Sequence, residues 1–253
     1  IERYPSIEFV EVPAGSFLIG SVNGFENERP TRQIFISKPF FISKYEISIL
    51  NYSMLVTGTY PIVENPGLPA SGISWLDAIK FCNSLSLSEG FEQCYKISND
   101  TVLWDTSANG FRLPTEAEWE KAARGTQGYI WPWGNDTPAD HLANLSSTNL
   151  TTIDNTTEVG FFPDGQSPYG IMDMAGNVYE WVADWYSATY YHEGSSITYD
   201  PTGPENNGSL KFKVVRGGSS AFGSWVAVSG FHDYEDPSVS GHALGFRCVQ
   251  KIP

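Results

Sequence analysis

The chain has 253 residues, with 24 glycines, 16 prolines and 14% aromatic residues, a composition rich in turns and rings that argues against a helical bundle. It carries 29 acidic and 15 basic residues, a net charge of −14, which disfavours binding to nucleic acid or to anionic lipid. No apolar run reaches the roughly 18 residues that a membrane-spanning helix needs, so we expect no transmembrane segment.

The N-terminal part of the chain is predicted to form strands. Residues 8–20 alternate apolar and small residues around a Pro-Ala-Gly turn, which predicts a hairpin. Residues 33–37 and 40–45 predict two further strands. Pro39 separates them, because proline cannot donate a hydrogen bond within a sheet.

Three helices are predicted next. Residues 48–56 have apolar side chains at helical spacing, and residues 74–90 (SWLDAIKFCNSLSLSEG) have both a capping serine and a terminal glycine. Residues 115–125 begin with a capping box, in which Thr115 is the N-cap and Glu118 follows three residues later. These local signals place both ends of the second and third helices.

The remainder of the chain is mostly irregular. Residues 128–168 have almost no hydrophobic period, and a loop of this length in a compact domain is usually functional or pinned by a ligand. Strands are predicted again at 213–216 and 245–250. Since no linker or internal repeat divides the sequence, we expect one α+β domain over residues 1–253.

Seven segments together carry a family resemblance. They are VPAGSFLIGS (12–21), FFISKYEIS (40–48), GISWLDAIKFCNSLS (72–86), GFRLPTEAEWEKAARG (110–125), GIMDMAGNVYEWVADWY (170–186), VVRGGS (214–219) and LGFRC (244–248). Their order and spacing resemble the formylglycine-generating enzyme (sulfatase-modifying factor) family across nearly the whole chain. The resemblance implies an α+β, C-type lectin-like fold of the formylglycine-generating enzyme type, with much irregular structure.

The segment DMAGNVYEW offers oxygen ligands for a metal ion. Asp173 and Glu180 supply carboxylates at its ends, and Gly176 and Asn177 permit a sharp turn whose carbonyls complete an all-oxygen cage. The resemblance implies structural calcium here and at a second site, while a turn held by hydrogen bonds alone is the alternative. The implied calcium ligands are Asp173, Gly176, Val178 and Glu180, and at the second site Asn144 and Asp154.

The catalytic cysteines of the resembling enzymes have no counterpart in this sequence. Those enzymes bind copper through two cysteines a few residues beyond the RGGS motif. Here residues 220–243 contain no cysteine, and no other side chain replaces a thiolate pair as a soft copper ligand. We therefore expect no copper, no catalytic residue and no formylglycine generation. The alternative is a cysteine-independent oxidative enzyme acting on a peptide or siderophore precursor.

The chain has three cysteines, too few for a disulfide scaffold. The resemblance implies one disulfide between Cys82 and Cys248, with Cys94 free. A disulfide indicates an oxidising compartment. We therefore expect export to the bacterial cell surface as an outer-membrane lipoprotein, with a leader and lipid anchor ahead of Ile1 that this chain does not include.

Residues 220–243 (SAFGSWVAVSGFHDYEDPSVSGHA) contain many rings without a helix or strand period. The variable proteins of diversity-generating retroelements use this fold, and their mutable segment lies between RGGS and GFR. Their mutable AAC codons never become Trp, Met, Gln, Lys or Glu, and only Trp225 and Glu235 here belong to that excluded set. The resemblance implies a diversified binding surface. A drifted loop packed on the core is the alternative.

We therefore expect a non-catalytic monomer that displays this segment to a protein or other macromolecular ligand. Aromatic anchors with small polar neighbours are typical of such surfaces. Trp225 is expected in the core, as a fixed scaffold residue. The candidate ligand-binding residues, expected to form one exposed patch, are Phe222, Ser224, Val226, Val228, Phe231, His232, Asp233, Tyr234 and His242.

Overall fold

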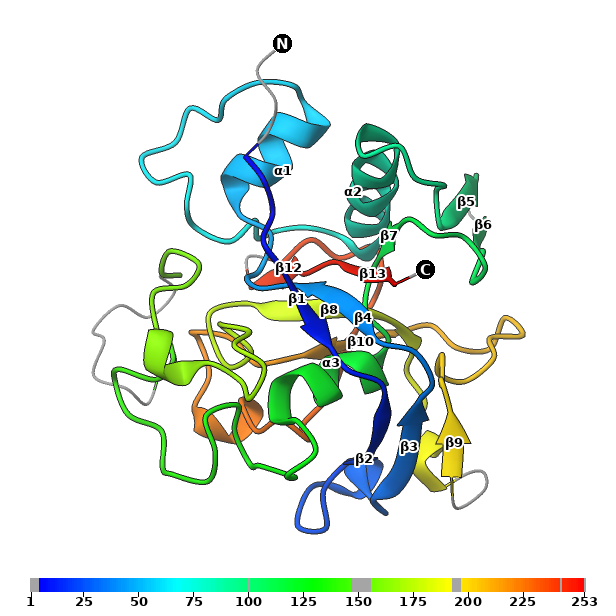
Figure 1. Cartoon of the computed structure of the whole chain (residues 1–253), viewed down its shortest axis with the longest axis vertical. Coiled ribbons are helices and arrows are strands. Elements are labelled where there is room, and N and C mark those ends of the chain that lie inside the picture. The colour runs from blue at the N-terminus through cyan, green and yellow to red at the C-terminus, as the bar shows by residue number, and fades with distance from the viewer. Residues whose placement is uncertain (1–4, 100, 147–155, 193–196, 242, 253) are drawn as a thin grey trace.

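The computed structural model describes residues 5–99, 101–146, 156–192, 197–241 and 243–252. Figure 1 shows a central band of strands, with α1 and α2 on one side of it and β2, β3 and β9 on the other. The helices are few, the strands are short, and long irregular segments connect them. This architecture confirms the expected α+β class.

The strands of the described residues form four small sheets, with orders β1-β4-β13-β7, β11-β10-β8-β12, β2-β3-β9 and β5-β6. The first two sheets lie at the centre of the molecule (Figure 1). The strands are β1 (Phe9–Val12), β2 (Gly15–Ile19), β3 (Arg32–Ile36), β4 (Phe40–Ser43), β5 (Tyr95–Ser98), β6 (Thr101–Trp104), β7 (Phe111–Arg112), β8 (Tyr179–Trp185), β9 (Ile197–Tyr199), β10 (Lys213–Arg216), β11 (Asp233–Glu235), β12 (Leu244–Phe246) and β13 (Val249–Lys251).

All three predicted helices are confirmed, as α1 (Ile49–Val56), α2 (Trp75–Ser88) and α3 (Glu116–Arg124). The hydroxyl of Ser74 accepts a hydrogen bond from the Asp77 N–H at the start of α2. The Thr115 and Glu118 side chains form both bonds of the predicted capping box on α3. None of the helices in the described ranges is long and apolar enough to cross a membrane.

The prediction of a hairpin over residues 8–20 is wrong. Both strands form, but β1 pairs antiparallel with β4 and β2 pairs antiparallel with β3, so the two belong to different sheets. Gly15 has a φ of 121°, a conformation that other residues rarely adopt, and it redirects the chain between them. Residues 245–250 likewise divide into β12, parallel to β8, and β13, antiparallel to β4.

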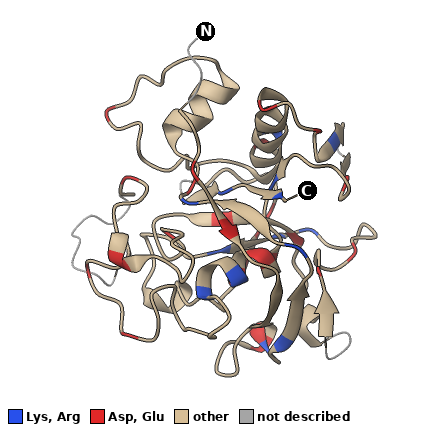
Figure 2. Cartoon of the chain, in the orientation of Figure 1, with Lys and Arg blue, Asp and Glu red and all other residues tan. Residues whose placement is uncertain are grey.

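Helix α3 is buried along its whole length although more than half of its side chains are charged. Arg112 forms a bidentate ion pair with Glu118, with both N–O distances at 2.6 Å. Glu120 binds Arg124 at 2.9 Å and Arg216 at 2.5 Å. Figure 2 shows the basic residues on α3 near the middle of the fold, whereas many acidic residues lie on outer loops. Paired charges therefore make this polar helix compatible with the core.

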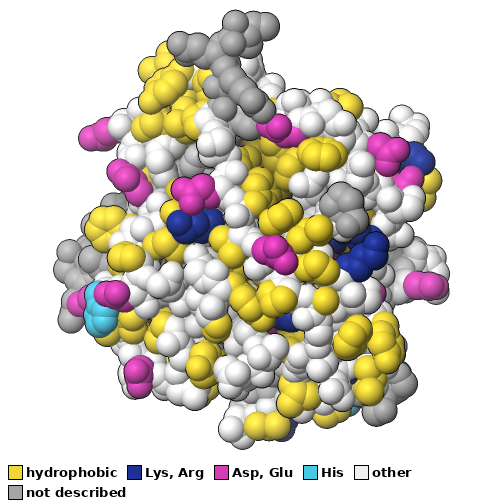
Figure 3. Space-filling view, in the orientation of Figure 1, with side chains coloured by type: hydrophobic (Ala, Val, Ile, Leu, Met, Phe, Trp, Pro, Cys, Tyr) yellow, Lys and Arg dark blue, Asp and Glu magenta, His cyan; other side chains and the backbone are white. Residues whose placement is uncertain are grey.

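Two hydrophobic clusters pack around this polar centre. One lies between α2 and the β8–β12 pair and includes Phe81, Trp181 and Phe246. The other lies between α3 and strands β2 to β4 and includes Trp119 and Ile42. On the face drawn in Figure 3, charged side chains are scattered among apolar and neutral ones, and some lie as pairs of opposite charge.

Glu120→Gln tests the buried ion pairs of α3. The substitution keeps the shape of the side chain but leaves Arg216 and Arg124 without their shared carboxylate, so we expect a loss of about 3 kcal/mol or more in the free energy of unfolding. Lys80→Met is the matched control, because its ion pair with Asp77 is exposed and contributes at most about 1 kcal/mol. Urea unfolding measures both, and equal losses would contradict the prediction.

Candidate ligand-binding surface

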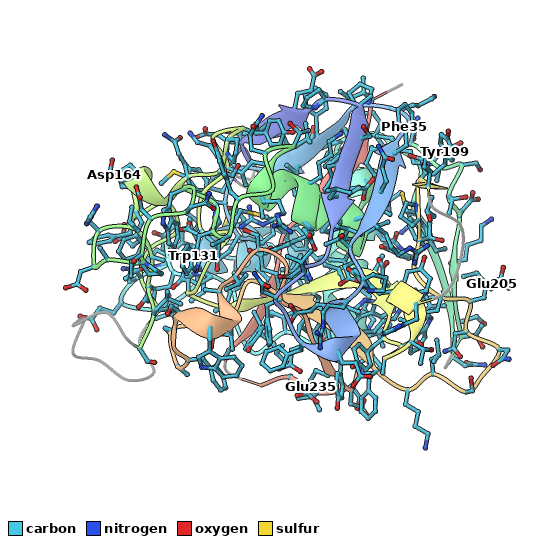
Figure 4. The ribbon with its side chains drawn as sticks, turned by 90° about the horizontal axis from the view of Figure 1, so that it is seen from below. Phe35, Trp131, Asp164, Tyr199, Glu205 and Glu235 are labelled. Atoms are coloured by element: carbon cyan, nitrogen blue, oxygen red, sulfur yellow. The ribbon has the colours of Figure 1, made fainter. Side chains whose placement is uncertain are left out.

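Residues 220–243 connect two strands that pair with the same neighbour. The segment follows β10 and leads to β12, and β8 lies between these two strands in the sheet. It contains one turn of 3-10 helix, Ser224–Val226, and the short strand β11. β11 pairs with β10 and is the edge of its sheet among the described strands. Figure 4 shows Glu235 of β11 at the periphery of the molecule, as expected for a surface segment.

Three aromatic side chains of the segment are exposed. Phe222 and Tyr234 are each 42% exposed, as expected. Trp225 is 56% exposed, so the expectation that it fills the core is wrong. The codon argument marks Trp225 as a residue outside the mutable set, and a fixed residue can lie on the surface as well as in the core. The half-buried candidates are Ser224, Val228 and Asp233.

Three candidate residues expected on the surface are buried, and those expectations are wrong. Val226 is fully buried because its side chain packs against Gly218, where any added Cβ would lie 2.7 Å from Val226 Cγ2. Phe231 is 6% and His232 3% exposed, and Phe231 joins the hydrophobic cluster at β8. His242 lies outside the described residues. The expected patch is therefore smaller than the set of candidates.

His232 connects the segment to the buried charges of α3. Its Nδ1 lies 2.5 Å from Oε1 of Glu116, and Arg216 Nη1 lies 3.2 Å from the same oxygen. Arg216 Nη2 also donates to the carbonyl of Ser229 at 2.7 Å. Burial alone would raise the pKa of Glu116, but the interactions with His232 and Arg216 outweigh it and hold this pKa below its usual value. The carbonyl of Ser229 and the imidazole of His232 thus attach the segment to the core.

Rings from other parts of the chain support the exposed rings. Phe25 contacts Trp225 and Phe231 edge-to-face, with ring centroids 6.3 and 6.0 Å apart. Tyr186 stacks on Tyr234 with centroids 4.1 Å apart. Such pairs contribute about 0.5–1.5 kcal/mol beyond their buried area. The sequence analysis did not assign Phe25 or Tyr186 to this surface. Phe25 is an isolated aromatic residue in a polar stretch, and Tyr186 ends the motif at 170–186, far from residues 220–243 in the sequence.

Glu180 does not fit the calcium site that the resemblance implies. Its two oxygens accept hydrogen bonds at 2.6 Å from Nε and Nη2 of Arg247, and Oε2 also accepts one from Trp119 Nε1. Gly176 and Val178 lie in the same buried turn. Because Glu180 already binds a guanidinium group inside the core, a calcium ion there would meet a positive charge of the protein itself.

Of the remaining implied ligands, Asp173 and Asn144 form hydrogen bonds within the protein. Asp173 is buried, accepts a backbone N–H at 2.6 Å, and has its pKa raised to about 6 by burial. Asn144 donates to the amide oxygen of Asn177. No group of three His, Cys, Asp or Glu residues is placed to hold a metal in the part of the chain that is described, and Asp154 lies outside it. Hydrogen bonds connect these side chains in the structure, and calcium binding at this turn stays a prediction.

The three cysteines are buried in the core, and none belongs to residues 220–243. Cys82 and Cys248 are unbonded thiols whose sulfur atoms lie 3.6 Å apart. Burial raises the pKa of Cys82 well above its usual value and that of Cys94 to about 11, so neither is a thiolate at neutral pH. The structure brings the implied disulfide partners together, and the bond itself stays a prediction.

Comparisons with known proteins give the relatives of this fold. A family model described as the sulfatase-modifying factor enzyme 1-like domain matches residues 2–252. The formylglycine-generating enzyme of Thermomonospora curvata is 31% identical over 95% of this chain and 92% of that protein. Treponema denticola variable protein 1 superposes with a TM-score of 0.80 at 27% identity, covering 99% of this chain and 98% of that one. PvdO from Pseudomonas aeruginosa has a TM-score of 0.74 at 22% identity over 100% of both chains. These likenesses confirm the expected C-type lectin-like fold.

Mild oxidation is expected to link Cys82 to Cys248 and to leave Cys94 reduced. The first two sulfur atoms are already in contact, whereas Cys94 is buried beside the carbonyl of Ala108. Peptide mapping by mass spectrometry identifies the link, and Cys94→Ser is the control that should not change it. A link between Cys82 and Cys94, or three free thiols after oxidation, would refute this pairing.

Asp173→Asn distinguishes a buried proton site from a calcium site. The folded-state pKa of about 6 is raised above the usual 3.8, so Asp173 costs stability as the pH rises through this window. We expect the variant to be more stable than the wild type at neutral pH, by at most about 3 kcal/mol, and the gap to close in acid. Urea unfolding at both pH values, with and without chelator, measures this. Destabilisation of the wild type by chelator alone would instead indicate bound calcium.

Proposed function

The chain belongs to the sulfatase-modifying factor enzyme 1-like family, and we propose that it is a non-catalytic member that binds a macromolecular ligand through residues 220–243. The likeness to Treponema denticola variable protein 1, which covers nearly all of both chains, supports a diversified ligand-binding role. In this proposal a retroelement diversifies the segment, and the rest of the chain is a constant scaffold.

The observation that carries the proposal is that some side chains of residues 220–243 are exposed while their neighbours are buried in the core. Trp225, Phe222 and Tyr234 are exposed, while Phe231 packs into the hydrophobic cluster at β8 and His232 binds Glu116 of α3. Exposed rings with buried anchors next to them give a surface that is ordered before the ligand arrives. A pre-ordered surface loses less conformational entropy on binding.

The position of the thiols supports the absence of family catalysis. The reaction of the related enzymes requires a cysteine pair after RGGS, and this chain has none between Ser220 and Ala243. Its three cysteines are buried elsewhere. In the same proposal the protein is exported, acts as a monomer at the bacterial cell surface, and meets its protein or other macromolecular ligand there.

A library of the segment tests the proposal directly. Residues Phe222, Ser224, Val228, Asp233 and Tyr234 are randomised, and the library is displayed on phage and selected against a purified model protein such as lysozyme. We expect folded variants with new affinity. Truncation of the aromatic anchors that the selection returns should then cost about 2 kcal/mol or more in binding free energy.

The matched control randomises the buried positions Val226, Phe231 and His232 instead. Because these side chains pack against the core, we expect most of these variants to lose their cooperative thermal unfolding. If the surface library also loses its fold, or if no binder emerges from it, the segment is not a display surface.

Formylglycine generation is expected to be undetectable. The protein is incubated with a Cys-X-Pro-X-Arg peptide, copper and a thiol reductant, and the aldehyde product is sought by mass spectrometry. A family enzyme with its cysteine pair serves as the positive control. Aldehyde formation above the protein-free background would overturn the non-catalytic assignment and favour an oxidative enzyme that does not need the cysteine pair.

A further inference from the structure

A cavity lined by aromatic rings lies next to the proposed binding segment. It has a volume of about 360 Å³ and opens between α2, the β5–β6 ribbon and the ends of β8 and β10. Trp75, Tyr95, Trp104 and Trp185 form its walls. This volume is at the lower end of the range for small-molecule pockets, and rings with a few polar groups are the usual lining of such pockets.

A single lysine provides the charged group of this cavity. Nζ of Lys213 lies 4.1 Å from the ring centroid of Trp75 and 3.9 Å from that of Trp185. It donates one hydrogen bond, to the carbonyl of Ala183 at 2.6 Å. Lys213 is 3% exposed, and burial lowers the pKa of its ammonium group to about 7, although Asp184 partly opposes this. An anion that reaches this nitrogen would stabilise its charged form.

A second polar group belongs to another lining residue, Trp104. The indole N–H of Trp104 is buried and has no hydrogen-bond partner among the described residues, and a buried donor without a partner costs free energy. A ligand with an acceptor oxygen would satisfy it. The positive charge of Lys213 also disfavours cationic ligands, which would otherwise be attracted to a set of aromatic rings.

We propose that this cavity binds a small planar aromatic molecule that carries a carboxylate, with the ring between the tryptophan walls and the carboxylate on Nζ of Lys213. The four rings lie outside residues 220–243, and only Pro237 and Ser238 of that segment line the cavity. This inference therefore goes beyond the macromolecular binding proposed above and does not depend on it.

Binding of matched naphthalene probes tests the inference by isothermal titration calorimetry at neutral pH. Naphthoate, naphthylmethanol and naphthylmethylamine share the same fused ring system and differ in the charge of the substituent. We expect naphthoate to bind at least about tenfold more tightly than the alcohol, because a hydrogen bond to a charged group is worth more than a neutral one, and the amine to bind most weakly.

Two variants test the charge of Lys213 and the space inside the cavity separately. Lys213→Met keeps the length of the side chain and should abolish the preference for the carboxylate. Thr202→Trp leaves Lys213 in place but fills the mouth of the cavity at an exposed lining position, and should weaken all three probes together. Phe161→Ala, on an exposed ring outside the cavity, is the matched control and should change nothing.

The outcomes are decisive even if Lys213→Met fails to fold, since the probe series on the wild type and the Thr202→Trp variant remain. Absence of binding to the wild type, equal affinity for carboxylate and alcohol, or undiminished binding by Thr202→Trp would each overturn the inference. None of these results bears on the phage selection with residues 220–243, so the two proposals fail or stand separately.

Discussion

The ion pairs of Arg216 are the constraint on which the rest of this structure depends. Its guanidinium group is fully buried and binds carboxylates of both Glu116 and Glu120 on α3. Removing such a charge from water costs several kcal/mol, and only well-placed partners offset that cost. The strand that carries Arg216 and the helix that carries the two acids must therefore assemble together. The polar sequence of α3 is explained by this requirement, since an apolar helix could not neutralise the arginine.

The same ion pairs determine where residues 220–243 are fixed to the core. Arg216 directly precedes the two-glycine turn that leads into residues 220–243, and His232 returns from that segment to Glu116. The segment is thus anchored in the core at Val226, Phe231 and His232. The exposed side chains of Trp225 and Tyr234 lie on either side of these anchors, each supported by a ring from outside the segment. In the proposed diversified surface, variation is therefore confined to side chains that can be replaced without breaking the ion pairs of Arg216.

The sequence predicts the features that short-range chemistry decides. The capping residues Ser74 and Thr115 need only the N–H groups of their own helices, and both helices begin where these residues predict. The pairing of strands that are far apart in the sequence is not predicted by such local signals. Residues 8–20 have the alternation of a hairpin, yet each strand finds its partner beyond residue 30, because local alternation says nothing about the neighbouring strand.

The prediction of the candidate sites from the sequence is limited in the same way, because contacts between distant residues decide them. Glu180 has the right residue type and spacing for a metal ligand, but a distant arginine, Arg247, occupies it. The exposure of Trp225 and the burial of Phe231 also depend on the loop that carries Phe25, which no nearby sequence signal connects to them. The family resemblance and the residue types pointed to this segment, while long-range packing decided which of its side chains face solvent.

The position of β8 between β10 and β12 has a consequence for how this surface can change in length. Both ends of the segment are held by one central strand, so they lie about 10 Å apart whatever the segment contains. Lengthening a flexible connection between fixed ends is inexpensive, since each doubling of its length costs only about 0.6 kcal/mol in closure entropy. Insertions between Ser238 and the start of β12, beyond the His232 anchor, would therefore enlarge the recognition surface with little effect on the scaffold.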